Sequence, residues 1–147
     1  MKFRYAYQKV LDLKSNEKTQ AEWMLSAAVG HLHSEQHSLE QLYTEKKNTA
    51  IKIQAEMESC SSIQSLNELQ YYVDFLDQCI STKLQDVFRA EQVVENKKIV
   101  LNEKMLDEKV WMKSKEKAQG RFQQEMLLRE QNELDEMATV RFAMRAH

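Results

Sequence analysis

Two histidines and two cysteines are the residues of this sequence whose types and spacing could support chemistry. His33 and His37 are four residues apart, the spacing at which two helical histidines can bind zinc. Glu35 lies about 200° around a helix from His33, so it cannot join them, and no third ligand is evident. Two solvated histidines explain the pattern as well as a zinc site does, and we predict no metal.

The cysteines, Cys60 and Cys79, are the remaining candidates, as a disulfide or as small apolar side chains. In the hairpin derived below they lie several helical turns apart, whereas a disulfide needs Cα atoms within about 7 Å. We therefore expect two reduced thiols that fill space. The sequence contains no phosphate-binding loop, dinucleotide fingerprint, nucleophile elbow or Cys-x-x-Cys motif. These absences predict a protein that is not an enzyme, with no catalytic residue, no cofactor and no small-molecule substrate.

The composition favours long helices with few turns. The 147 residues include no proline and two glycines, where average usage would give roughly 7 and 10. The 21 basic and 23 acidic residues are mixed along the chain, with a net charge of −2, so we expect no nucleic-acid partner. No apolar run approaches the roughly 20 residues of a membrane span, and the start lacks a secretory signal. We expect a cytoplasmic protein.

Apolar residues recur at alternating steps of three and four, as in a coiled coil; we call this series the heptad seam. Its first part comprises Ala21, Leu25, Ala28, Leu32, Glu35, Leu39 and Leu42, then longer steps through Lys46 and Ala50 to Ile53, Met57 and Cys60. Its second part comprises Leu66, Leu69, Val73, Leu76, Ile80, Lys83, Val87, Ala90 and Val94, and less regularly Leu101, Met105, Met112, Phe122, Met126 and Met137.

A serine cluster at residues 59–65 separates the two parts and predicts a turn. Ser65 and Glu68 form the S-x-x-E pattern of a helix start. We predict an all-α fold, a long antiparallel two-helix coiled-coil hairpin in a single domain. Its helices would cover about residues 6–58 and 66–142, so that the second helix is longer.

Folding the chain about residue 63 places Tyr5 opposite Arg121 and leaves the stretch after about Phe122 unpaired. We call this stretch the overhang. It carries Met126, Leu127, Leu128, Leu134, Met137, Val140, Phe142 and Met144. An unpaired apolar group of this size is expected to bind a partner. Trp23 and Trp111 fall off the seam, where they could anchor a partner or cover the edge of the seam.

The two ends of the chain carry recognisable patterns. The first is the series Tyr5, Tyr7, Val10, Leu11, Leu13, Lys14, Glu17 and Lys18. The second is the acidic segment at residues 130–137, followed by Arg141 and Phe142. Both patterns resemble those of the flagellar export protein FliJ family. Length, central turn and unpaired second helix agree with the family.

The resemblance implies a soluble, stalk-like component of the flagellar type III export apparatus, peripheral to the membrane through its partners. Those partners would be the export ATPase ring and the membrane export gate, with export chaperones as further candidates. The protein would act as a general chaperone and escort factor. The ring-binding residues would be Tyr5, Tyr7, Leu11, Leu13, Phe122, Met126, Leu134, Met137 and Phe142.

The export-gate surface of the family matches Tyr72, Leu76, Cys79 and Lys83 on the second helix. Its first-helix half would fall at residues 38, 42, 45 and 49, where Leu42 alone is apolar or aromatic. Two alternatives remain beside this hypothesis. One is a structural coiled coil that dimerises obligately through its overhang. The other is the equivalent stalk protein of a virulence-type secretion system.

Overall fold

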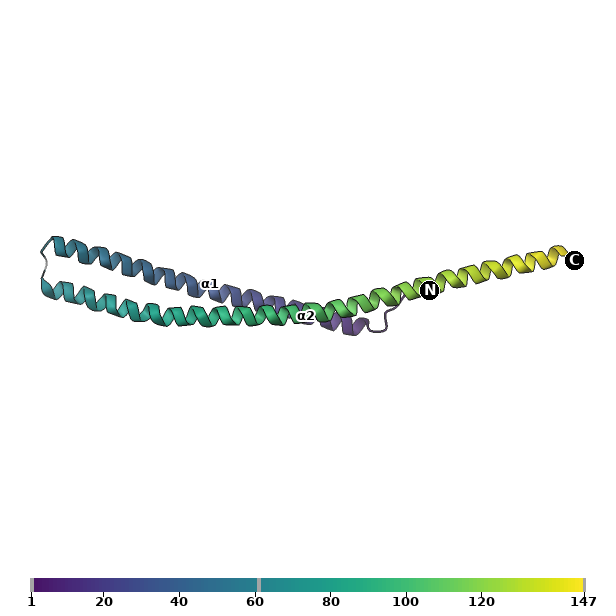
Figure 1. The fold of residues 1–147 in the computed structure, drawn as a ribbon, viewed down its shortest axis with the longest axis horizontal. Coiled ribbons are helices and arrows are strands. Elements are labelled where there is room, and N and C mark those ends of the chain that lie inside the picture. The colour runs from purple at the N-terminus through teal and green to yellow at the C-terminus, as the bar shows by residue number, and fades with distance from the viewer. Residues whose placement is uncertain (1, 61, 147) are drawn as a thin grey trace. The chain divides into compact units, whose positions relative to one another are not determined.

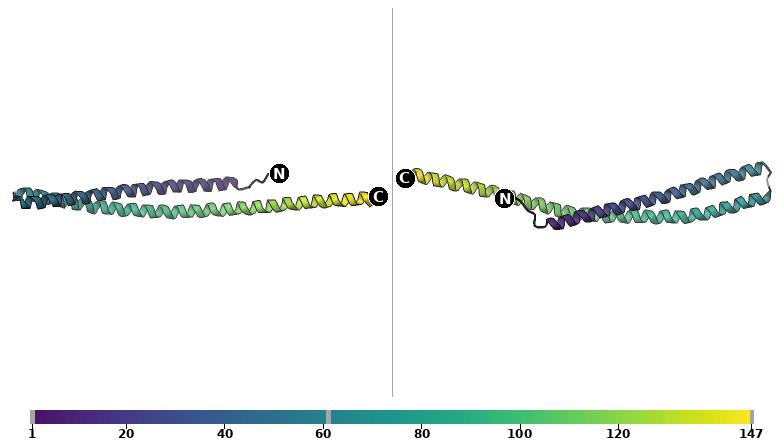
Figure 2. Two further views of the ribbon diagram at one scale, coloured as in Figure 1. Left: turned by 90° about the horizontal axis from the view of Figure 1, so that it is seen from above. Right: turned by 180° about the vertical axis from the view of Figure 1, so that it is seen from behind.

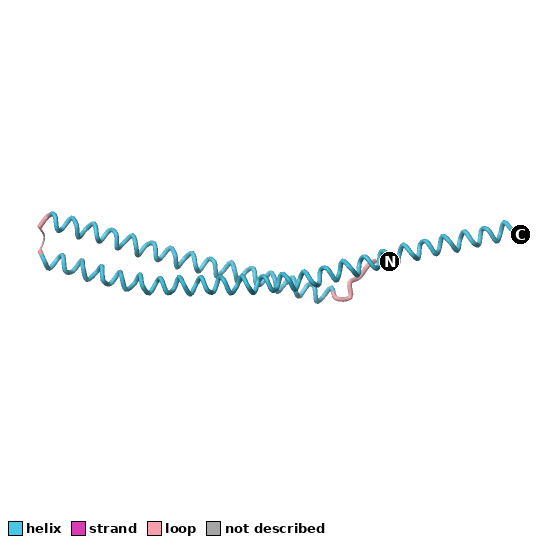
Figure 3. Tube along the Cα trace, in the orientation of Figure 1, coloured by secondary structure: helices cyan, strands magenta, loops and turns pink. Residues whose placement is uncertain are grey.

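The computed structural model describes residues 2–60 and 62–146, and helices dominate these residues. Helix α1 covers Gln8–Glu58 and helix α2 covers Ile63–Ala146. Loop occurs before α1 and in the short turn between the helices (Figures 1 and 3). The two long helices pack against each other, which confirms the predicted all-α helical hairpin.

The chain groups into two units, and each contains segments of both helices. One unit comprises residues 20–102 and includes the turn, while the other comprises residues 1–19 and 103–147. Within the first unit the helical segments run antiparallel away from the turn, as Figure 1 shows.

The core of the unit that includes the turn follows the predicted seam of the second helix. Its buried apolar side chains are Ala21, Leu76, Ile80, Val87, Ala90 and Val94. Every other predicted seam residue between Leu66 and Val94 is half-buried. This agreement follows from an apolar stripe of spacing three and four, which faces the one neighbouring helix.

Near the turn, the first helix keeps a regular heptad, so the longer steps predicted after Leu42 are wrong. After Leu42 and Lys46, the covered positions are Thr49, Ile53 and Glu56, whereas Ala50 and Met57 are exposed. Thr49 is 2% exposed, and its hydroxyl donates to the carbonyl of Glu45 at 2.8 Å. A buried threonine is tolerated in the seam because that bond satisfies its polar atom.

The start of α2 differs from the prediction by three residues. The Ser62 hydroxyl accepts a hydrogen bond from the Ser65 amide at 3.2 Å, so Ser62 caps the helix in place of Ser65. The earlier start adds hydrogen-bonded backbone to the helix. In the unit that holds the chain termini, Tyr5 contacts Ser114, two helical turns before the predicted Arg121.

Cys60 carries the strain of the turn, because its φ is +55° without its being a glycine. It follows the last residues of α1, where a left-handed residue commonly ends a helix and glycine is preferred. We expect Cys60→Gly to raise the free energy of unfolding by about 1 kcal/mol by relieving this conformation. Urea unfolding would measure the change, and Cys60→Ala, which keeps a Cβ, should show no gain.

In the unit that holds the chain termini, the charged residues Lys104 and Glu108 occupy two of the covered seam positions of α2. Lys104 contacts Glu17 at 3.4 Å and Lys18 contacts Glu108 at 3.3 Å, both across the two helices. Met105 and Met112, which the sequence placed on the seam, are exposed. Trp111, which the sequence placed off the seam, is half-buried, and its ring lies 5.7 Å from that of Tyr7, so its predicted position is wrong.

Among the described residues of this unit, no helix lies beside the overhang. Phe122 still packs on Phe3, with ring centroids 5.5 Å apart, and Met126 is half-buried. All residues from Leu127 to Ala146 are exposed, and Figure 2 shows the end of α2 continuing alone past the amino terminus. This confirms the predicted overhang.

Candidate interaction surfaces

The predicted gate-binding residues of α2 lie partly inside the helix pair. Leu76 is 3% exposed, Cys79 and Lys83 are half-buried, and Leu42 of α1 is half-buried as well. Leu76 and Lys83 are seam residues, so their side chains contact α1. Tyr72 is the most exposed of the set, at 40%.

Tyr72 joins the two halves of this predicted surface. Its hydroxyl donates to the carboxylate of Glu45 at 3.1 Å, and its ring stacks on Phe75 with centroids 6.4 Å apart. Phe75 is 57% exposed and Tyr71 is 73% exposed. The sequence could have identified Phe75 as an exposed aromatic residue, because it lies one residue before the seam residue Leu76. These three aromatic rings form the accessible part of the surface, which we call the aromatic face.

Lys83 links α2 to α1 through an ion pair in this part of the hairpin. Its ammonium lies 2.9 Å from the carboxylate of Glu35 and 3.8 Å from that of Asp86. The hydrogen bond to Glu35 raises the pKa of Lys83, against a smaller opposing effect of desolvation. The hydrogen bond to Glu45 likewise raises the pKa of Tyr72. Both groups are thus held in their protonated forms.

We expect these two links to weaken at alkaline pH. A raised pKa means that the folded state binds the proton more tightly than the unfolded state, so stability falls as pH rises. The contribution of each link is complete below the ordinary values of 10.0 for Tyr72 and 10.5 for Lys83. Thermal melts between about pH 8 and 12 should show a smaller alkaline loss in Tyr72→Phe with Lys83→Met than in the wild type. Parallel curves would contradict the assignment.

The predicted ring-binding residues divide between packed and accessible side chains. Tyr5 and Leu11 are buried, at 9% and 6% exposed, and hold the amino-terminal segment against α2. Phe122 and Met126 are half-buried. The exposed members are Tyr7, Leu13, Leu134, Met137 and Phe142. The sequence could not separate these groups, because both consist of apolar and aromatic residues.

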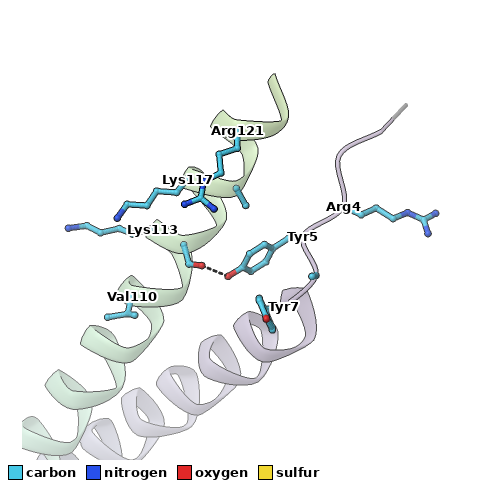
Figure 4. Close-up of a pocket in the computed structure, with 10 residues that line it drawn as sticks. Arg4, Tyr5, Tyr7, Val110, Lys113, Lys117 and Arg121 are labelled. Atoms are coloured by element: carbon cyan, nitrogen blue, oxygen red, sulfur yellow. Dashed lines mark hydrogen bonds between the residues drawn. The ribbon is translucent and has the colours of Figure 1, made fainter. Parts of the chain in front are cut away.

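An open hollow of about 620 Å³ lies between the amino-terminal segment and α2. Figure 4 shows Tyr5 reaching across to α2, where its hydroxyl donates to the Ser114 hydroxyl at 2.8 Å. Four basic residues line the hollow, Arg4, Lys113, Lys117 and Arg121, together with Tyr5 and Tyr7. Sequence reasoning missed this cluster, although the spacing of four residues between its three α2 members was readable. Its charge favours an acidic partner.

The histidines and cysteines first considered for chemistry gather no further ligand among the described residues. His33 and His37 are exposed, and His37 hydrogen-bonds Gln41 at 3.2 Å. Cys60 and Cys79 are both free thiols. Across residues 2–60 and 62–146 no three potential ligands gather to hold a metal ion. The helices of the same residues include none with the length and apolar character needed to cross a membrane.

The whole length of the chain matches a known family. A family model described as the flagellar FliJ protein matches residues 2–147. The chain belongs to the FliJ family. The flagellar FliJ protein of Bacillus subtilis (strain 168) is similar to it, with 25% identity over 147 residues and 100% of each chain covered.

Membership of the FliJ family makes the chain a non-enzymatic component associated with the flagellar export apparatus. A solved structure, that of a putative YscO homolog, CT670, from Chlamydia trachomatis, resembles it with a TM-score of 0.59. That alignment covers 98% of this chain and 98% of the other, at 17% sequence identity. At this identity the likeness supports the fold alone, and it agrees with the helical hairpin.

Proposed function

We propose that this FliJ-family chain is a coupling component that contacts the export ATPase ring and the membrane export gate. The amino-terminal segment and the overhang bind the ring, and the aromatic face binds the gate. The protein acts on the cytoplasmic side of the membrane, peripherally and through these partners, as a general chaperone and escort factor.

One observation supports this proposal above the others: the overhang is apolar and uncovered. Its exposed large side chains are Leu127, Leu128, Leu134, Met137, Val140, Phe142 and Met144. Isolated helices of this length are marginal in water, so a partner that covers the apolar side chains would stabilise the helix. The four cations of the nearby hollow add attraction for an acidic surface of the ring.

A truncation after Met126 tests the ring contact without disturbing the packed part of the unit, because it keeps Phe122 on Phe3. We expect the truncated chain to lose most of its capture by the export ATPase, while its melting profile retains the cooperative transition of the hairpin. A full-length Leu134→Ser, Phe142→Ser variant should lose capture in the same direction. Wild-type capture by the truncated chain would refute the overhang contact.

The flagellar system is preferred over a virulence-type system because the family model and the Bacillus relative are both flagellar and both extend over the whole chain. Restoration of motility in a cell that lacks its own flagellar FliJ protein would distinguish the two systems. A chain of the virulence type would leave such a cell non-motile.

A further inference from the structure

The overhang carries a heptad series of its own that reads alike from both ends. Alternating steps of three and four from its first exposed leucine select Leu127, Glu130, Leu134, Met137, Arg141 and Met144, all of which are exposed. Their order is apolar, acidic, apolar, apolar, basic, apolar. We call these six residues the overhang seam.

Reversing the direction of the overhang seam exchanges its acidic and basic positions and leaves the apolar positions apolar. In an antiparallel coiled coil, an a residue of one helix faces a d residue of the neighbouring helix. Two overhang seams would therefore stack Leu127 on Met144 and Leu134 on Met137. Glu130 would face Arg141 in two symmetric layers. A parallel pair would instead place glutamate on glutamate and arginine on arginine.

We propose that the overhang pairs antiparallel with the overhang of a second copy of this chain, with Glu130 of each copy against Arg141 of the other. Charge complementarity selects this occupant, because the same sequence supplies both the acid and the base at matching positions. The two ionic layers fix the register, since a shift by one heptad would place charges opposite apolar residues.

The pairing is reversible and sensitive to salt. The exposed helix is roughly 30 Å long at 1.5 Å per residue, and charged residues fill a third of its seam positions. Ionic layers stabilise less than apolar layers, and salt screens them. Leu134 and Met137 also belong to the proposed ring-binding surface, so one overhang binds a second copy or the ring, one at a time. The self-pairing stands without the proposed ring contact.

Charge reversal tests the proposal on the full-length protein alone. Sedimentation equilibrium over a range of concentrations, in reductant because Cys60 is exposed, would give the dimer Kd. We expect Glu130→Arg to weaken the dimer at least about 100-fold, because both ionic layers then bring arginines together. Arg141→Glu should act equally through paired glutamates. Glu136→Arg, which makes the same charge change away from the overhang seam, should leave the Kd within about threefold of the wild type.

Two combinations identify the register. A chain carrying both Glu130→Arg and Arg141→Glu should dimerise again, and an equimolar mixture of the two single variants should form heterodimers. Three results would each overturn the proposal: a wild-type chain that stays monomeric at its highest soluble concentration, single variants that dimerise like the wild type, or no recovery in the double variant. Circular dichroism of each variant shows whether the helices remain, so that a lost dimer is not mistaken for an unfolded chain.

Discussion

Replacing Leu76 by alanine is expected to lower the free energy of unfolding by about 2–5 kcal/mol, the range for removing a buried leucine side chain. Leu76 is 3% exposed, at the middle of the apolar run of α2 that includes Ile80. A two-helix pair has few other layers of side chains, so the cavity left beside the neighbouring helix is not filled. Urea unfolding followed by circular dichroism measures the effect.

The matched control for this prediction is Tyr71→Ala, which truncates a larger side chain that is 73% exposed. It should change stability by less than about 0.5 kcal/mol. Equal effects of the two variants would show that Leu76 is not part of a core. Leu76→Glu would separate the helices by burying a charge, so a loss of gate binding by that variant would not identify a surface. Phe75→Ser tests the aromatic face with the core intact.

Replacing Tyr5 by alanine is expected to release the amino-terminal segment from α2. Tyr5 is 9% exposed, donates to Ser114 at 2.8 Å and packs edge-on against Tyr7 at 5.8 Å. Loss of a buried aromatic ring costs about 3 kcal/mol or more, which corresponds to roughly a hundred-fold in the opening equilibrium. Limited trypsin digestion should therefore cut faster after Arg4.

Two milder variants separate the ring of Tyr5 from its hydroxyl. Tyr5→Phe and Ser114→Ala each remove one hydrogen bond, worth about 0.5–1.5 kcal/mol, and should accelerate cleavage far less than Tyr5→Ala. The double variant should be cleaved only slightly faster than either single variant, because both substitutions remove the same hydrogen bond. If Tyr5→Ala is cleaved after Arg4 at the wild-type rate, the segment is not held by this residue.

The hairpin could be predicted because its strongest determinants are local and apolar. Absence of proline, the serine cluster and the unbroken series from Leu66 to Val94 were sufficient for the two helices and the overhang. The predicted N-cap of α2 was wrong because both Ser62 and Ser65 can cap a helix, and the spacing of Glu68 favoured Ser65. The helix forms an additional bonded turn when Ser62 caps it.

The seam was misread wherever polar side chains fill it. A search for apolar residues selects Ala50, Met57 and Met105, whereas the structure covers their neighbours Thr49, Glu56 and Lys104. Long charged side chains can bury their stems and pair their charged ends, so a seam position need not be apolar. The exposed ring of Phe75 was not singled out for a related reason: the resemblance selected Leu76 and Lys83, which point toward α1, and Phe75 lies beside them.

The ion pairs Lys104–Glu17 and Lys18–Glu108, which cross between the helices, make the stability of the terminal unit depend on salt more than that of an apolar interface. At 0.1 M salt the screening length is about 10 Å, so attraction between such partly exposed charges diminishes with added electrolyte. Leucine and valine layers in the unit with the turn lose nothing by the same addition, and sulfate or phosphate strengthens them. Added salt can thus loosen the terminal unit, whereas the apolar layers of the unit with the turn keep its helices together even where the Lys83–Glu35 pair is weakened.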